Sequence, residues 1–159
     1  GPAHGWGRVN ADGIDQNRTF RIDGPDPEGQ PVEQHLCQLD LESMMNSERP
    51  LTSFWSFHTW QGPAEVMVRP GTTIPDWQVV RNNLLDLDTE GLFEPMHDFR
   101  PTFQKSTMWN EGVHDRFGIT TFLSEGGSTH YTKGQCLRAG RTLIQALARY
   151  RAESAGRSQ

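Results

Sequence analysis

The stretch Leu51–His58 reads LTSFWSFH and directly follows Pro50. Apolar and aromatic side chains fill it up to the histidine that ends it. A run of this length, bounded by a proline, is typical of a strand that is covered on both faces. A second run, Ile119–Leu123 (ITTFL), is β-branched and apolar, and it also predicts a strand. Any fold for this chain has to accommodate these two strands.

Apolar residues at helical spacing predict three helices around these strands. The first begins at Pro31, where proline suits a helix start, and runs to about Met45. The second follows Pro75, and the third closes the chain from about Gly134. The stripes are Val32, Leu36 and Leu39; Trp77, Val80, Leu84 and Leu87; and Leu137, Leu143, Ile144, Leu147 and Tyr150.

The alternation of strands and helices predicts an α/β fold with a mixed, mostly parallel sheet flanked by helices. Residues 66–68 are expected to add a short edge strand, and residues 92–110, with two prolines and little periodicity, a long loop. No linker divides the chain, so we expect a single domain over residues 1–159. Two clear strands are too few to complete such a sheet. The fold is therefore expected to be incomplete at its N-terminus, unless further strands escape the pattern.

Composition narrows the class of partner. The formal net charge is -5 and the pI about 5.6, so no nucleic-acid partner is expected, because phosphate binding needs a concentrated basic surface. No run is long enough to span a membrane, and no membrane partner is expected. Cys37 and Cys136 show no zinc-motif spacing, and their pairing stays open. The compartment also stays open, with the cytoplasm slightly favoured.

A polar segment near the start, RVNADGIDQNRTF (Arg8–Phe20), is the first candidate for chemistry. Arginine grips a carboxylate through a planar fork of donors. Arg8 and Arg18, with the Asn17 amide between them in sequence, are suited to hold one carboxylate and polarise a nearby carbonyl. The alternative is a solvated, turn-rich loop.

The other two candidates follow the predicted strands. His58 ends the first strand, and Glu125 comes just after the second. Ligands bind at the carboxyl ends of strands in open α/β sheets, where a histidine can bind metal and a carboxylate can act as a general base. The alternatives are a histidine that caps its strand and an exposed turn glutamate. Two further pairs at metal-binding spacing, Glu94 with His97 and Glu111 with His114, lie in segments expected to be loop.

Together these segments resemble the carboxy-terminal part of the catalytic domain of the zinc carboxypeptidase (metallocarboxypeptidase A-like) family. The motif GIDQNR (Gly13–Arg18), with Arg8 upstream, resembles the family's substrate-carboxylate segment. SFWSFHTW resembles the strand that ends in a zinc-binding histidine, and GITTFLSE resembles the strand that ends in the catalytic glutamate. The order of these segments matches that of the family.

The resemblance implies a zinc-dependent hydrolase that releases a C-terminal amino acid from a peptide or an amino-acid conjugate with a free carboxylate. In that reading His58 is a zinc ligand, and Glu125 takes a proton from zinc-bound water and passes it to the leaving amine. Arg8 stabilises the oxyanion, while Asn17 and Arg18 hold the terminal carboxylate of the substrate.

The chain departs from the family at two points. It contains no His-x-x-Glu motif, which in the family supplies two zinc ligands, and no tyrosine precedes Glu125. One histidine does not hold a catalytic zinc, so this chain by itself can be inactive, with the missing N-terminal part of the domain as a partner. Two alternatives stay open: a non-catalytic carboxylate-binding module, and an amino-acid deacylase of the same fold.

Overall fold

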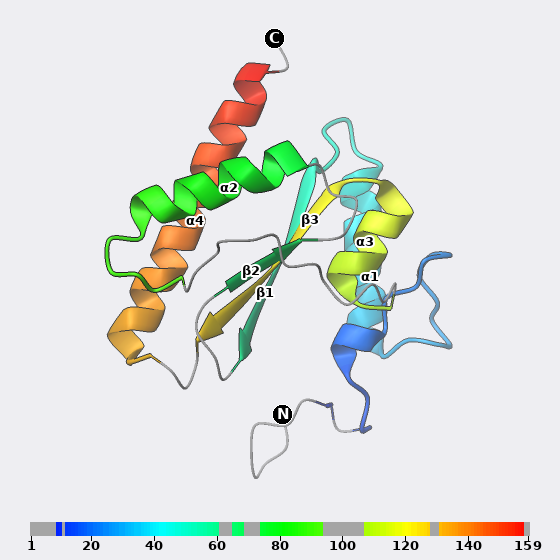
Figure 1. Ribbon diagram of the computed structural model, residues 1–159. Helices are drawn as coiled ribbons and strands as arrows, with labels where there is room; N and C mark the ends of the chain where they lie inside the picture. Colours follow the sequence, from blue (N-terminus) through cyan, green and yellow to red (C-terminus); the bar gives the residue numbers. More distant parts are fainter. Residues whose placement is uncertain are drawn as a thin grey trace. The chain divides into compact units, whose positions relative to one another are not determined.

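The computed structural model describes residues 9–10, 12–60, 65–68, 74–93, 107–127 and 131–157, with the backbone alone for some of them. Helices and strands alternate along the chain, as predicted, and the fold is α/β (Figure 1). The elements are η1 (Gln16–Arg18), α1 (Val32–Met45), β1 (Ser53–Trp60), β2 (Glu65–Val68), α2 (Ile74–Leu87), α3 (Trp109–Phe117), β3 (Thr120–Gly127) and α4 (Lys133–Arg157).

The described strands form one mixed sheet in the order β1-β3-β2. β1 runs parallel to β3, while β2 pairs with β3 in the antiparallel direction, with Glu65 opposite Glu125. Parallel strands need a crossover connection, which here is the long stretch of chain between β1 and β3. The predicted mixed sheet flanked by helices is confirmed.

The chain divides into two compact units, each with its own apolar core. One comprises residues 1–54 and 103–121, and the other residues 55–102 and 122–159. The core of the first contains Phe20, Leu41 and Val113. The core of the second joins β3 to α2 and α4, and contains Val80, Leu84, Leu92, Phe93, Phe122, Ala139, Leu143, Ala146 and Tyr150. The prediction of a single domain over residues 1–159 stays a prediction.

Helix α1 forms where it was predicted, but its apolar stripe does not face a core. Val32 is 69% exposed, Leu36 54% and Leu39 44%. The opposite side of the helix is the buried one, where Gln38 is fully buried and Leu41 is 3% exposed. The periodicity therefore predicted the helix correctly, while the stripe that revealed it lies on the solvent side.

The buried amide of Gln38 is hydrogen-bonded through both its oxygen and its nitrogen to the segment before α1. Its Oε1 accepts hydrogen bonds from the Arg21 backbone N–H at 3.1 Å and from Gln30 Nε2 at 2.8 Å. Its Nε2 donates to the Arg21 backbone carbonyl at 2.7 Å, and Gln30 Nε2 also donates to the Thr19 carbonyl. A buried amide with these partners fixes the chain before α1 onto the helix.

We expect Gln38→Leu to lower the free energy of unfolding by about 3 kcal/mol, because buried groups left without partners cost ~1–3 kcal/mol each. Urea unfolding followed by tryptophan fluorescence would measure the change. Ser43→Leu, at an exposed position of the same helix, is the matched control and should shift the free energy by no more than about 0.5 kcal/mol. Equal effects of the two substitutions would contradict the role given to the amide.

Helix α3 was not predicted, since residues up to 110 were expected to be loop and Glu111 and His114 were placed in loop as well. Both residues lie in α3. Glu111 is fully buried, and Nδ1 of His114 lies 2.9 Å from the Ile119 carbonyl oxygen. The helix ends at Gly118, whose φ of 68° lies in the left-handed region that favours glycine. The pair Glu94 and His97 lies outside the described residues.

Two other expectations concern cysteines and membranes. Neither Cys37 nor Cys136 forms a disulfide in the part of the chain that the structure describes. Within the ranges described, no helix has both the length and the apolar character needed to cross a bilayer.

Candidate functional site

The turn that carries Asn17 and Arg18 is stabilised by hydrogen bonds to Asp15, the residue that precedes it. It is the short helix η1, and Asp15 caps it: Asp15 Oδ1 accepts the Asn17 backbone N–H at 3.1 Å, and the Asp15 carbonyl accepts the Arg18 N–H at 2.9 Å. Asp15 thus has a local structural role. The backbone bearing the two candidate side chains is fixed before any ligand is considered.

Asn17 also links this turn to a helix far along the chain. Its Oδ1 accepts the backbone N–H of Trp109, the first residue of α3, at 3.2 Å. Helix starts leave such N–H groups without a partner inside the helix, so Asn17 acts as a cap for α3. The carbonyl oxygen of the Asn17 amide is therefore engaged in holding the start of α3.

Arg18 is half-buried, and its guanidinium donates from Nη1 to the Asn17 carbonyl at 2.8 Å. Among the residues that the structure describes, no carboxylate forms an ion pair with it. A guanidinium has five N–H donors in a fixed fork, and this bond uses one of them. Arg8, the other arginine of the predicted site, lies outside the described residues.

His58 lies inside β1, two residues before its end, because the strand extends further than predicted. The side chain is partly buried, and its Nε2 is hydrogen-bonded to Ser56 Oγ at 2.8 Å. Residues two apart on a strand share a face, which explains this contact. Ser56 thereby fixes the orientation of the imidazole ring.

Glu125 lies inside β3, also two residues before the strand end, and the structure describes its backbone. Trp55 of β1 and Phe122 of β3 pack with ring centroids 4.3 Å apart, on the face covered by the second core. His58 and Glu125 each come three positions further along. Both positions therefore lie near the ends of two adjacent strands, on the face opposite that of Trp55 and Phe122.

The described residues do not make a zinc site by themselves. No group of three or more histidine, cysteine, aspartate or glutamate side chains in the described ranges is arranged to hold a metal ion. His58 is a suitable donor type, yet catalytic zinc takes about three protein ligands. The zinc predicted from the sequence therefore needs donors besides His58.

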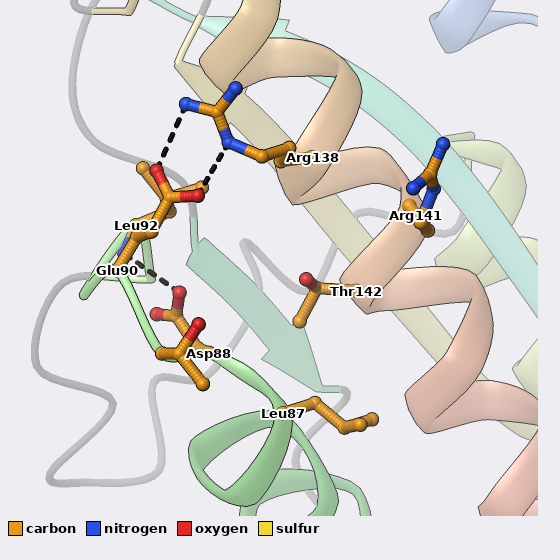
Figure 2. A pocket seen from close by; sticks show the side chains of 8 residues that line it. Leu87, Asp88, Glu90, Leu92, Arg138, Arg141 and Thr142 are labelled. Carbon is orange, nitrogen blue, oxygen red and sulfur yellow. Dashed lines mark hydrogen bonds and ion pairs between the residues drawn. The ribbon is translucent and has the colours of Figure 1, made fainter.

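A pocket of about 140 Å³ lies elsewhere, between the end of α2 and α4 (Figure 2). Its acidic side chains are already engaged. Asp88 accepts the backbone N–H groups of Leu92 and Phe93 at 2.9 and 2.7 Å, and Glu90 forms a two-point ion pair with Arg138. The ion pair that lines this pocket connects the segment after α2 to α4. Among the arginines of α4, Arg138 and Arg149 are exposed and form ion pairs with Glu90 and Asp86.

Asn17 and Arg18 belong to the first unit, whereas His58 and Glu125 belong to the second. Each pair is thus placed within its own unit, and the convergence of all four on one cavity stays a prediction. Sequence reasoning missed two contributors, Ser56 and Trp109. The serine two positions before His58 was a usable signal, whereas the contact of Asn17 with Trp109 spans 92 residues and leaves no local trace.

Comparison with known proteins identifies the fold. A metallo-carboxypeptidase from Pseudomonas aeruginosa, solved with (2-guanidinoethylmercapto)succinic acid, matches 89% of this chain with a TM-score of 0.65 and 19% identity. A metallo-carboxypeptidase from Burkholderia cenocepacia matches 92% of the chain at a TM-score of 0.65 and 13% identity. A carboxypeptidase structure from Burkholderia mallei matches 91% at a TM-score of 0.63 and 17% identity.

These likenesses concern the fold, because the identities are low. No family model and no curated protein sequence matches the chain. The chain spans about 40% of the length of the structures it resembles. The chain therefore has the fold of part of a metallo-carboxypeptidase-like domain.

Proposed function

We propose that this chain is the carboxy-terminal part of a zinc-dependent hydrolase that releases a C-terminal amino acid from a peptide or an amino-acid conjugate. The observation that supports the proposal is the order of the sheet: β1 and β3 are adjacent and parallel, His58 lies near the end of β1, and Glu125 lies near the end of β3. Ligands of open α/β sheets bind at that edge. The likeness to metallo-carboxypeptidase folds supports the same reading.

In this proposal Glu125 moves the proton. It accepts a proton from the water that attacks the scissile carbonyl carbon and then delivers it to the leaving amine nitrogen as the C–N bond breaks. A positioned general base and acid of this kind contributes ~10²–10⁴-fold to the rate. His58 would contribute one zinc ligand, its ring oriented by Ser56, with the remaining ligands from polypeptide outside this chain. A bound zinc would supply a lowered water pKa and charge stabilisation.

The arginines and Asn17 account for the requirement for a free carboxylate. Arg18 has no carboxylate partner in the described part of the chain, so a substrate carboxylate can use its donors without displacing an existing ion pair. Asn17 would donate from its NH₂ group while its carbonyl oxygen caps α3. Arg8 would stabilise the oxyanion, a role in which losing one donor typically costs ~3 kcal/mol.

A second candidate is a carboxylate-binding module without chemistry. It is favoured by one observation, that no metal-holding group occurs within the described residues. In this case Arg18 and Asn17 would bind a carboxylate, and the positions of His58 and Glu125 would have no catalytic meaning. An amino-acid deacylase of the same fold differs from the first proposal only in the acyl group that it removes.

The test uses the full-length protein that contains this chain, with an N-acylated dipeptide and the same compound amidated at its C-terminus. We expect about one zinc per protein by elemental analysis, and cleavage of the free acid at least ~100-fold faster than of the amide, because Arg18 binds a charge that the amide lacks. If the protein bound the free acid but contained no zinc and cleaved neither compound, the carboxylate-binding module would be the correct proposal and the hydrolase would be rejected. Absence of both binding and cleavage would refute the two proposals together.

A further inference from the structure

The pocket between the end of α2 and α4 has walls of opposite charge (Figure 2). One wall is the end of α2 with the segment after it, and it carries the carboxylates of Asp88 and Glu90. The other wall is α4, and it carries the guanidinium groups of Arg138 and Arg141. All the residues that line the pocket belong to the second compact unit. The pocket is thus a slot within one unit, lined by charges of both signs.

Only one of the two cations on this slot is paired in the described part of the chain. Arg138 forms the two-point ion pair with Glu90. The guanidinium of Arg141, three residues further along α4, has no hydrogen bond or ion pair with any residue that the structure describes. Asp88 lines the same slot and does not reach it. Opposite charges that face one slot without meeting can both be satisfied by a molecule that carries a cation and an anion.

The wall formed by the end of α2 is suited to a cationic group. The two carboxylate oxygens of Asp88 accept the backbone N–H groups of Leu92 and Phe93, one each, at 2.9 and 2.7 Å. An ionised carboxylate has about four acceptor positions, so each oxygen can accept a second hydrogen bond. The C-terminal end of α2, at Leu87, adds partial negative charge on the same side. An ammonium group, with its three N–H donors, matches this wall.

The remaining lining sets the size and shape of the ligand. The hydroxyl group of Thr142 stands beside Arg141 on the basic wall, and Leu87 and Leu92 supply apolar surface. The hydroxyl group of Tyr131 donates to the Leu92 carbonyl, which helps to hold that wall in place before any ligand binds. The volume is about 140 Å³. Since a protein cavity of about 150 Å³ holds a benzene molecule, the slot takes a ligand of only a few carbon atoms.

We propose that this pocket binds a free α-amino acid with a short aliphatic side chain, in its zwitterionic form. Its ammonium group lies against Asp88, Arg141 binds its carboxylate through the guanidinium fork, and its side chain contacts Leu87 and Leu92. The site residues predicted from the sequence are not among the described residues that line this pocket. The proposal therefore does not rest on the proposed hydrolase, and either can fail without the other.

The test is equilibrium dialysis of the full-length protein against radiolabelled L-valine. The protein carries Arg18→Gln throughout, so that valine held as a product at that turn is not counted. We expect one saturable site with a Kd of ~1 mM, as is reasonable for so small a ligand. Arg141→Gln should raise this Kd by ~10-fold or more, because it removes a charged, forked contact. Lys133→Gln removes the same charge from an exposed position of α4 that does not line the pocket, and should change the Kd by less than about twofold.

Competition by two analogues tests both charges without altering the protein further. Valinamide lacks the carboxylate and 3-methylbutanoate lacks the ammonium group, so each should displace valine at least ~10-fold less well than unlabelled valine does. If 3-methylbutanoate competed as well as valine, the slot would bind a simple anion and the amino-acid proposal would be overturned. It would also be overturned by the absence of saturable binding up to ~20 mM valine, or by equal losses of affinity in Arg141→Gln and Lys133→Gln.

Discussion

Glu125→Gln is expected to lower kcat for hydrolysis of a C-terminal peptide bond by about 10³-fold or more, with the fold and the zinc content of the full-length protein unchanged. Glutamine has the size of glutamate but does not take a proton from water, so the substitution removes the step assigned to this residue and little else. Steady-state kinetics on a blocked dipeptide, together with elemental analysis of the purified variant, would measure both effects. A variant that retains more than about a tenth of the activity would remove Glu125 from the mechanism.

The sheet provides a matched control for this experiment. Glu65 of β2 is the register partner of Glu125 across the antiparallel pair, so Glu65→Gln removes a carboxylate one strand away in the same sheet. We expect its kcat to stay within about threefold of the original value, because β2 is not the parallel neighbour that carries His58. If Glu65→Gln were the inactive variant and Glu125→Gln the active one, the general base would be Glu65. Loss of zinc from either variant would point instead to a metal ligand.

The spacing of apolar residues and the local composition were sufficient to predict the helices and strands that have regular apolar patterns. The aromatic run before His58 predicted β1, and the stripes predicted α1, α2 and α4. Helix α3 was not predicted because the residues that it buries include Asn110 and Glu111, which interrupt an apolar repeat. The side of α1 that packs was hidden for the same reason, since Gln38 finds its partners in the backbone of Arg21, 17 positions away.

The candidate site shows the same division between local and distant information. The positions of His58 and Glu125 near strand ends could be inferred from two short runs and the rule for ligands of α/β sheets. That the two strands lie next to each other depends on the strand order of the sheet, which no local sequence pattern contains. The cap that Asn17 provides to α3 likewise depends on a contact between distant segments. Such contacts come from the packing of the whole chain and not from its periodicity.

The second prediction with a large expected effect concerns Arg18. Its neighbour Asn17 caps α3, so substitutions at the two positions should distinguish loss of ligand binding from loss of stability. Arg18→Gln is expected to raise KM for a substrate with a free carboxylate by ~100-fold, with a much smaller change in kcat, and to abolish the preference over the amidated substrate. The reason is the loss of a charge-assisted, forked contact. The KM of Arg18→Lys should lie between those of the original protein and Arg18→Gln, since lysine keeps the charge but lacks the forked donors. Kinetics with the paired acid and amide substrates would measure each case.

The controls for this prediction come from Asn17. In Asn17→Asp a side-chain oxygen still accepts the Trp109 N–H, so α3 keeps its cap, but the NH₂ donor becomes an anion that repels the substrate carboxylate. In Asn17→Ala the cap is lost, and the free energy of unfolding should fall by ~1 kcal/mol. We therefore expect Asn17→Asp to raise KM at nearly unchanged stability, and Asn17→Ala to affect both. If Asn17→Asp and Arg18→Gln both left KM unchanged, this turn would be a structural brace for α3, and recognition of the carboxylate would have to be sought elsewhere in the protein.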